Sequence, residues 1–133
     1  MTHPSYSSPV GQHILLDLYD CKNCLDNVSS IEAIMLNAAK HSGATIVDTR
    51  FHEFSPQGVS GMVIIKESHF SIHTWPEHNF ASVDIYTCGE SIDFEKAVNW
   101  LKKELQSENS VQKHFERGNF TIDEKPKYNE VSI

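Results

Sequence analysis

Three runs of strand-like sequence follow one another between residues 58 and 89, and they restrict the possible folds more than any other part of the chain. Residues 59–65 are rich in β-branched side chains and almost wholly apolar, as expected of a strand covered on at least one face. Residues 69–74 and 80–88 alternate between aliphatic and polar side chains, which is the strand period. A turn is predicted at 76–79 because proline presets φ and asparagine tolerates a left-handed conformation. These runs predict part of a β-sheet.

The predicted strands each have one aliphatic face and one polar face. Alternation places His69 and His73 on the polar face of the second run, and Cys88 among the polar positions of the third. So many reactive side chains are unusual in a segment that only fills a core. We therefore interpret the polar face as a candidate active site.

Two amphipathic helices are also predicted, one before and one after these three strands. Ser29 and Glu32 have the spacing of a capping box, Gly43 is a stop signal, and Ser91 or Asp93 could cap the second helix. The apolar positions recur with helical spacing, at Ile31, Ile34, Met35 and Ala38 and then at Ala97, Val98, Leu101 and Leu105.

Other strands are predicted at 12–19 and 44–51, and a short extended piece at 120–122. Strands with two such helices favour an α+β fold, a two-layer sandwich in which an antiparallel sheet carries helices on one face. The other face would hold the polar residues. A second copy of the chain could cover it.

Composition supports a single domain at residues 11–122, between a loose N-terminal arm at 1–10 and a polar tail at 123–133. The chain has 133 residues, of which 39% are hydrophobic and 22% charged. A net charge of −7 argues against nucleic acids and anionic membranes as partners. No apolar run approaches the roughly 20 residues of a membrane span, and no signal peptide is evident, so we expect a cytoplasmic protein.

The Cys21-Lys22-Asn23-Cys24 motif could be half of a zinc site or a redox pair. No second CxxC or nearby histidine pair completes four ligands, so we expect no metal. Three cysteines without a signal sequence are expected to be reduced thiols.

Three motifs stand out, GVSG at 58–61, ESHFSIHTWPE at 67–77 and VDIYTCG at 83–89, and they are supported by FHEFSPQ at 51–57 and GQHILLDLYDC at 11–21. Through these motifs the chain resembles the small bacterial and archaeal S-adenosylmethionine decarboxylase proenzymes over roughly residues 11 to 105. The resemblance implies a self-processing proenzyme that serves spermidine biosynthesis. It also implies a homodimer whose active sites draw on both protomers.

Decarboxylation of an amino acid leaves electrons on the α-carbon that no ordinary side chain can delocalise, so an electron sink is needed. This chain is short for a pyridoxal-phosphate fold. The resemblance implies instead that Ser68 attacks the carbonyl of Glu67 and that elimination then cuts the chain into residues 1–67 and 68–133. A covalent pyruvoyl group would remain at Ser68 and form a Schiff base with S-adenosylmethionine.

The resemblance also implies roles for other residues. His73 would transfer a proton during processing, which suits an ordinary histidine pKa of about 6.5, and Ser60 would assist. Cys88 would protonate the product carbanion; an ordinary cysteine pKa of about 8.5 keeps a thiol mostly protonated near neutrality. Phe54 would stack on adenine and Glu77 would bind the ribose hydroxyls.

One departure from the family pattern follows the Pro-Glu pair. His78-Asn79-Phe80 stands where relatives often have aromatic-glycine-aromatic. Three alternatives stay open: a pyruvoyl decarboxylase for free ornithine or arginine, a non-catalytic regulatory partner subunit, and a metal-binding module using Cys21 and Cys24.

Overall fold

The computed structural model describes residues 9–23 and 25–119. Within these residues, six strands, two α-helices and one 3-10 turn follow one another: β1 (Gly11–Cys21), α1 (Val28–His41), β2 (Ile46–Glu53), β3 (Val59–Ile65), β4 (Ser68–Trp75), η1 (Pro76–His78), β5 (Phe80–Cys88), α2 (Phe94–Glu104) and β6 (Ser107–Arg117).

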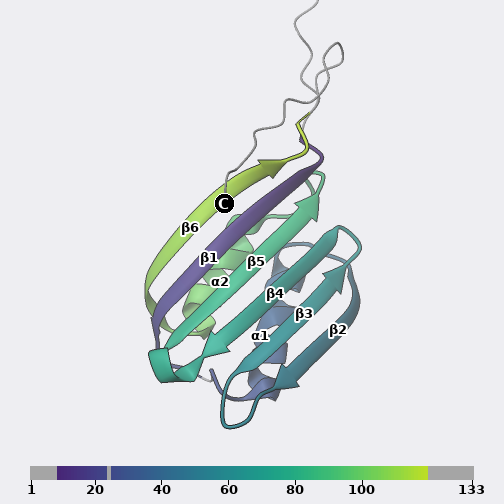
Figure 1. Ribbon diagram of the computed structural model, residues 1–133. Coiled ribbons are helices and arrows are strands. Elements are labelled where there is room, and N and C mark those ends of the chain that lie inside the picture. Colours follow the sequence, from purple (N-terminus) through teal and green to yellow (C-terminus); the bar gives the residue numbers. More distant parts are fainter. Residues whose placement is uncertain (1–8, 24, 120–133) are drawn as a thin grey trace, which may run out of the picture.

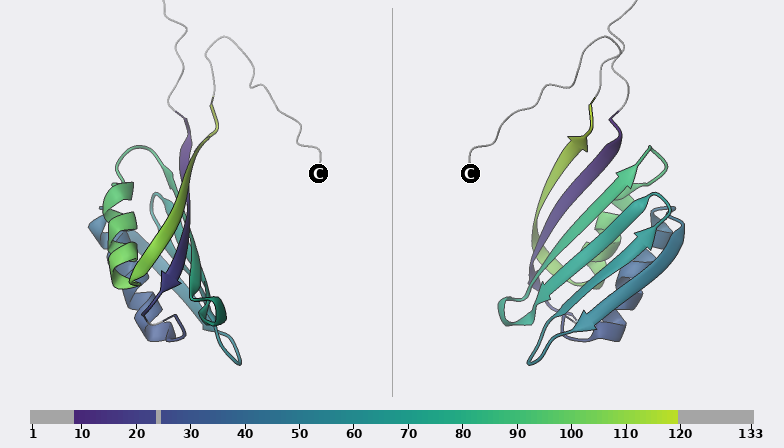
Figure 2. Two further views of the ribbon diagram at one scale, coloured as in Figure 1. Left: turned by 90° about the vertical axis from the view of Figure 1, so that its left-hand side faces the viewer. Right: turned by 45° about the vertical axis from the view of Figure 1, so that its right-hand side comes forward.

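All six strands form one antiparallel sheet in the order β2-β3-β4-β5-β1-β6, so β1 lies between β5 and β6 (Figure 1). Both helices pack on one face of this sheet (Figure 2), which confirms the predicted two-layer α+β sandwich. Within the described residues, no helix or strand covers the other face. We call it the open face; its central row across the six strands is Arg50, Met62, Ser71, Asp84, Leu15 and Lys113, and it continues at every second position of each strand.

The core lies between the sheet and the helices. Strand alternation supplies one side of it, since β5 buries every second residue from Ala81 to Thr87. Phe70 and Ile72 of β4 are fully buried on the same face. The helices supply the other side through their predicted apolar stripes, and full burial of each large aliphatic side chain contributes about 1.5–3 kcal/mol.

The helix caps agree only in part with the prediction. The side chain of Asn27 accepts a hydrogen bond from the Ser30 N–H at 2.9 Å, so the N-cap of α1 is Asn27 and the prediction of Ser29 is wrong. Asparagine and serine serve equally well as caps, and Ser29 lies inside the helix. Asp93 caps α2 by accepting from the Lys96 N–H at 3.1 Å, as one of the two predicted candidates.

Strand β6 lies where the sequence predicts only polar, irregular chain. Nearly all its side chains are exposed, so it has no hydrophobic alternation, and its backbone pairing with β1 holds it in place. The predicted strands at 12–19 and 44–51 are present, with limits that differ by one or two residues. The predicted piece at 120–122, the tail, and residues 1–8 of the arm lie outside the described residues.

Candidate active site

The Glu67–Ser68 peptide bond lies in the tight turn between β3 and β4. The Glu67 carbonyl oxygen accepts a hydrogen bond from the Cys88 backbone N–H at 2.9 Å, across the neighbouring strand. On the other side of the turn, the Thr45 N–H donates to the Glu67 carboxylate at 3.1 Å, and the Lys66 N–H donates to the Thr45 carbonyl oxygen at 2.8 Å. The predicted cleavage site is therefore held by hydrogen bonds on both sides.

Ser68 and Cys88 have different surroundings although their strands are neighbours. Ser68 is half-buried, lies directly opposite Thr87, and shares its side of β4 with the core residue Phe70. Cys88 is a free cysteine with an exposed side chain, and alternation places it on the open face. One end of the sheet thus carries a predicted nucleophile at the start of β4 and a predicted proton donor at the end of β5.

A second cluster lies near the other end of β4. Ser60 and His73 are directly opposed on β3 and β4, and the Ser60 Oγ is 2.7 Å from the His73 Nδ1. They line a pocket of about 290 Å³ whose other walls are Phe54, Gln57, Gly58, Thr74, Trp75 and Glu77. The structure therefore brings together four of the predicted site residues, namely Ser60, His73, Phe54 and Glu77.

The two clusters are separate within one chain. Ser68 and His73 begin and nearly end the same strand, so about 17 Å of extended chain separates them. The pocket is lined by neither Ser68 nor Cys88. His69, His73 and Cys88 share the open face as predicted, but His73 pairs with Ser82 whereas Cys88 lies at the far end of that strand.

Thr74 and Asp26 position the wall of the pocket, and sequence reasoning missed both. The Thr74 hydroxyl donates to the Leu25 carbonyl at 2.7 Å and accepts from the Val59 N–H at 2.9 Å. The Asp26 carboxylate accepts from the Gly58 N–H at 2.8 Å. Gly58 has a φ of +103°, which favours glycine. These bonds join segments far apart in the sequence, so no local pattern could have indicated them.

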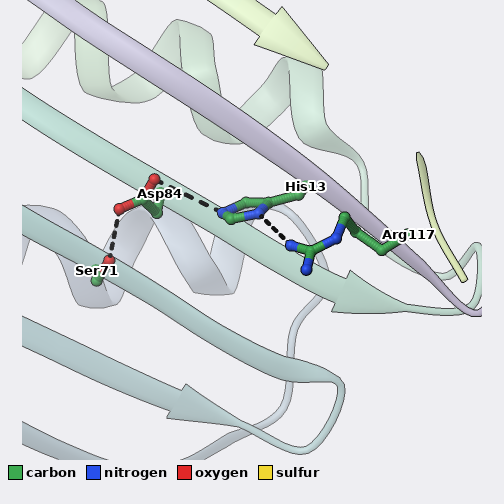
Figure 3. Close-up of polar contacts among 4 residues, drawn as sticks. All are labelled: His13, Ser71, Asp84 and Arg117. Carbon is green, nitrogen blue, oxygen red and sulfur yellow. Dashed lines mark hydrogen bonds and ion pairs between the residues drawn. The ribbon is translucent and has the colours of Figure 1, made fainter. Parts of the chain in front are cut away.

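A chain of polar contacts crosses the open face (Figure 3). The Ser71 hydroxyl donates to Asp84 at 3.4 Å, and the His13 Nε2 lies 3.6 Å from the other Asp84 oxygen. The Nδ1 of His13 lies 3.3 Å from the Arg117 guanidinium. Because arginine can only donate, Nδ1 is the acceptor, and the His13 proton then faces Asp84.

His69 adjoins this polar chain and is the neighbour of Ser68. The Tyr86 ring lies between the two histidines, 5.2 Å from His13 and 5.8 Å from His69. Burial is the main cause that lowers the pKa of His69, and His13 lowers it further, against an opposing effect of Asp84. His69 is therefore harder to protonate than an ordinary histidine.

Cys21, the described cysteine of the CxxC motif, lies elsewhere, at a larger pocket of about 700 Å³. Burial is the main cause that raises the pKa of the Cys21 thiol, and Cys24 lies outside the described residues. Within residues 9–23 and 25–119, no group of three or more histidine, cysteine or acidic side chains is arranged to hold a metal ion. Neither described helix has the length and apolar composition needed to span a bilayer.

Comparisons with known proteins agree on one family. The family model described as S-adenosylmethionine decarboxylase matches residues 12–118. A protein named S-adenosylmethionine decarboxylase proenzyme from Thermosipho africanus is 53% identical over 100 residues, which cover 74% of this chain and 77% of the relative. A proenzyme of the same name from Fervidobacterium nodosum is 47% identical over 125 residues, covering 93% of this chain and 85% of the relative.

A solved structure shares the fold. The crystal structure of the adenosylmethionine decarboxylase from Aquifex aeolicus superposes with a TM-score of 0.80 at 34% sequence identity. The match covers 91% of this chain and 100% of that one.

Proposed function

The chain belongs to the S-adenosylmethionine decarboxylase family, and we infer that it decarboxylates S-adenosylmethionine after cutting itself between Glu67 and Ser68. The observation that carries this proposal is the hydrogen bond from the Cys88 N–H to the Glu67 carbonyl, at 2.9 Å. It holds the carbonyl that Ser68 must attack. A pyruvoyl group at position 68 fits this place, because a half-buried serine follows a restrained carbonyl at a tight turn.

In the first step of processing, the Ser68 Oγ attacks the carbonyl carbon of Glu67. A C–O bond forms, the peptide C–N bond breaks, and the hydroxyl proton passes to the released nitrogen, which leaves an ester. Negative charge builds up on the Glu67 oxygen during the attack. The Cys88 N–H already lies within the range of an oxyanion donor, so it stabilises that charge without reorganisation.

In the second step, a base removes the α-proton of Ser68, a Cα–Cβ double bond forms, and the Cβ–Oγ bond breaks, which releases the Glu67 carboxylate and cuts the chain. We propose His73 as the base, because an imidazole ring can accept and release a proton as a general base. Its hydrogen bond with Ser60, at 2.7 Å, orients the ring. Hydrolysis of the new N-terminus then releases ammonia and leaves the pyruvoyl group.

His73 must come from a second copy of the chain, since about 17 Å of strand separates it from Ser68 in the same copy. A homodimer that stacks two open faces would bring the turn of one protomer to the pocket of its partner. The open face suits such burial because it carries several large apolar side chains that are exposed to solvent in a single chain. They are Tyr19, Met62, Ile64, Trp75, Val111 and Phe115, each at least 39% exposed.

The pocket at His73 is the proposed substrate site. Its volume of about 290 Å³ is at the lower limit for a drug-sized ligand, as expected if the partner supplies the remaining walls. Phe54 is 46% exposed and offers a face on which adenine can stack, and Glu77 offers a carboxylate to the ribose hydroxyls. A decarboxylase for a free amino acid would have no use for either contact, so both favour S-adenosylmethionine over ornithine or arginine.

The ketone of a pyruvoyl group supplies the electron sink that loss of CO2 requires. Cys88 adjoins the position of that group along the sheet and is exposed on the open face, where the substrate would lie in the dimer. We propose that its thiol delivers the proton that replaces the carboxylate.

A denaturing intact-mass spectrum tests the processing step. The freshly purified chain should give two fragments divided between Glu67 and Ser68, the second blocked at its N-terminus. Ser68→Ala should remain one uncut chain. Cleavage of Ser68→Ala at this bond would overturn the proposal.

A further inference from the structure

Thr87 has a buried hydroxyl that no hydrogen bond satisfies. The residue is fully buried on β5, facing the helix layer, and its Oγ1 has no hydrogen-bond partner among the described residues. Leaving a buried hydroxyl unpaired is unfavourable, because the group gives up its hydrogen bonds to water and gains none in the protein. Thr74, the other buried threonine of this core face, shows the contrast, because its hydroxyl both donates and accepts. Valine would fill the same space at position 87 without burying an unpaired hydroxyl, so packing alone does not account for threonine at this position.

Ser68 is the residue directly opposite Thr87. The hydrogen bond from the Cys88 N–H to the Glu67 oxygen joins the residue before Ser68 to the residue after Thr87. Ser68 and Thr87 are therefore a non-hydrogen-bonded pair, the type of antiparallel pair whose side chains lie closer together. The Cβ atoms of directly opposed residues lie about 4.5–5.5 Å apart. The Thr87 Oγ1 has no hydrogen-bond partner in the structure, so the two hydroxyls are not in hydrogen-bond contact there. We expect rotation about χ1 to bring them into contact.

We propose that Thr87 is a positioning residue for self-cleavage, whose hydroxyl accepts a hydrogen bond from Ser68 before the attack on Glu67. The inference rests on the function proposed above. The contact would restrict Ser68 to one of its three staggered rotamers. Thr87 takes no proton, because the hydroxyl proton of Ser68 passes to the departing nitrogen.

Thr87 and Cys88 then act together from adjacent positions on β5. The side chain of Thr87 orients the nucleophile, and the backbone N–H of Cys88 orients the carbonyl that the nucleophile attacks. This arrangement accounts for a hydroxyl that is otherwise unpaired and buried. It also predicts that the role of Thr87 ends when the chain is cut.

The test compares Thr87→Val, which keeps the shape, with Thr87→Ser, which keeps the hydroxyl. The full-length chain is made in a short pulse of cell-free synthesis, and intact mass then follows loss of the uncut precursor. Losing one neutral hydrogen bond should slow self-cleavage of Thr87→Val about fivefold to tenfold. Thr87→Ser should remain within about twofold of the wild type.

Two further readouts separate positioning from a merely structural role. The Tm of the cut Thr87→Val protein should equal or exceed that of the cut wild type, because after cleavage the Thr87 hydroxyl is buried and unpaired and valine removes it. The kcat per cut chain, measured after complete processing, should be unchanged. If Thr87→Val does not fold, Thr87→Ala replaces it in the same assay.

Self-cleavage of folded Thr87→Val at the wild-type rate would overturn the role of Thr87 while Ser68→Ala remains uncut. Cleavage of Ser68→Ala would instead overturn the proposed function itself. A slow Thr87→Val with an equally slow Thr87→Ser would assign the effect to packing and not to the hydroxyl.

Discussion

Ser68 and His73 lie on the same strand but on opposite faces of it, near opposite ends. Five positions of an antiparallel strand span about 17 Å, far beyond the reach of a proton transfer. Processing at Ser68 by His73 therefore needs two copies of the chain. The predictions below follow from this separation and from the contacts around each residue.

Replacement of His73 should stop processing after the ester has formed. His73→Ala leaves the turn and the Cys88 N–H intact, so the acyl shift can proceed while elimination slows by about 100-fold or more. Hydroxylamine, which cleaves esters, should then cut the chain at residue 67. Ser60→Ala should slow elimination less, by about tenfold, because only the hydrogen bond to the ring is lost. His41→Ala, on the helix layer, is the control, and unaided maturation of His73→Ala at the normal rate would refute the role of His73.

Cys88→Ala should separate the two activities of the protein. Its contact with Glu67 is through the backbone N–H, which alanine keeps, so self-cleavage should continue. Decarboxylation should fall by about 100-fold or more because the proton donor is gone. Intact mass and release of CO2 from carboxyl-labelled substrate measure the two steps on one sample. Full turnover by the variant would exclude Cys88 as the proton donor.

Changes in the pocket should weaken substrate binding without changing maturation. Phe54→Leu and Glu77→Gln should each raise KM by about tenfold, corresponding to one lost stacking or hydrogen-bond contact. Self-cleavage precedes substrate binding, so its rate should be unchanged and serves as the internal control. An unchanged KM in both variants would place the nucleoside elsewhere.

His69 should make stability depend on pH. Its pKa is lowered in the folded state, mainly by burial, so the unfolded chain takes up the proton first as the solution becomes acidic. Stability should therefore decrease as pH falls below about 7.5, through the ordinary histidine range. Urea titrations on the uncut Ser68→Ala background measure this slope, and adding His69→Gln should reduce it. Equal slopes with and without His69 would contradict the expected uptake.

The sequence predicted five of the six described strands, and most clearly β3, β4 and β5. These three strands have one face in the core, so the order of apolar and polar residues along them indicates which side chains are buried. Strand β6 was not predicted because its side chains are exposed and only its pairing with β1 defines it. The roles of Asp26 and Thr74 were not predicted for a related reason, since each residue makes its contacts with residues far away in the sequence.

The residues of the candidate site were predicted better than their arrangement. Motif spacing identified the Ser60 and His73 pair, which the structure places 2.7 Å apart. Alternation indicated that His73 and Cys88 share a face, but a shared face says nothing about distance along it. The sequence offered no reason to assign a role to Thr87, because an unpaired hydroxyl can be recognised only when its surroundings are known.

Complementation between two inactive chains tests the shared site most directly. Ser68→Ala and His73→Ala chains carrying different mass tags are co-expressed, and intact mass reports which chain is cut. In a mixed dimer, one site combines Ser68 of the His73→Ala chain with His73 of the Ser68→Ala chain. We expect a fraction of the His73→Ala chain to be cut between Glu67 and Ser68, while the Ser68→Ala chain stays intact. If mixed dimers form and both chains stay uncut, the active site is not shared between protomers.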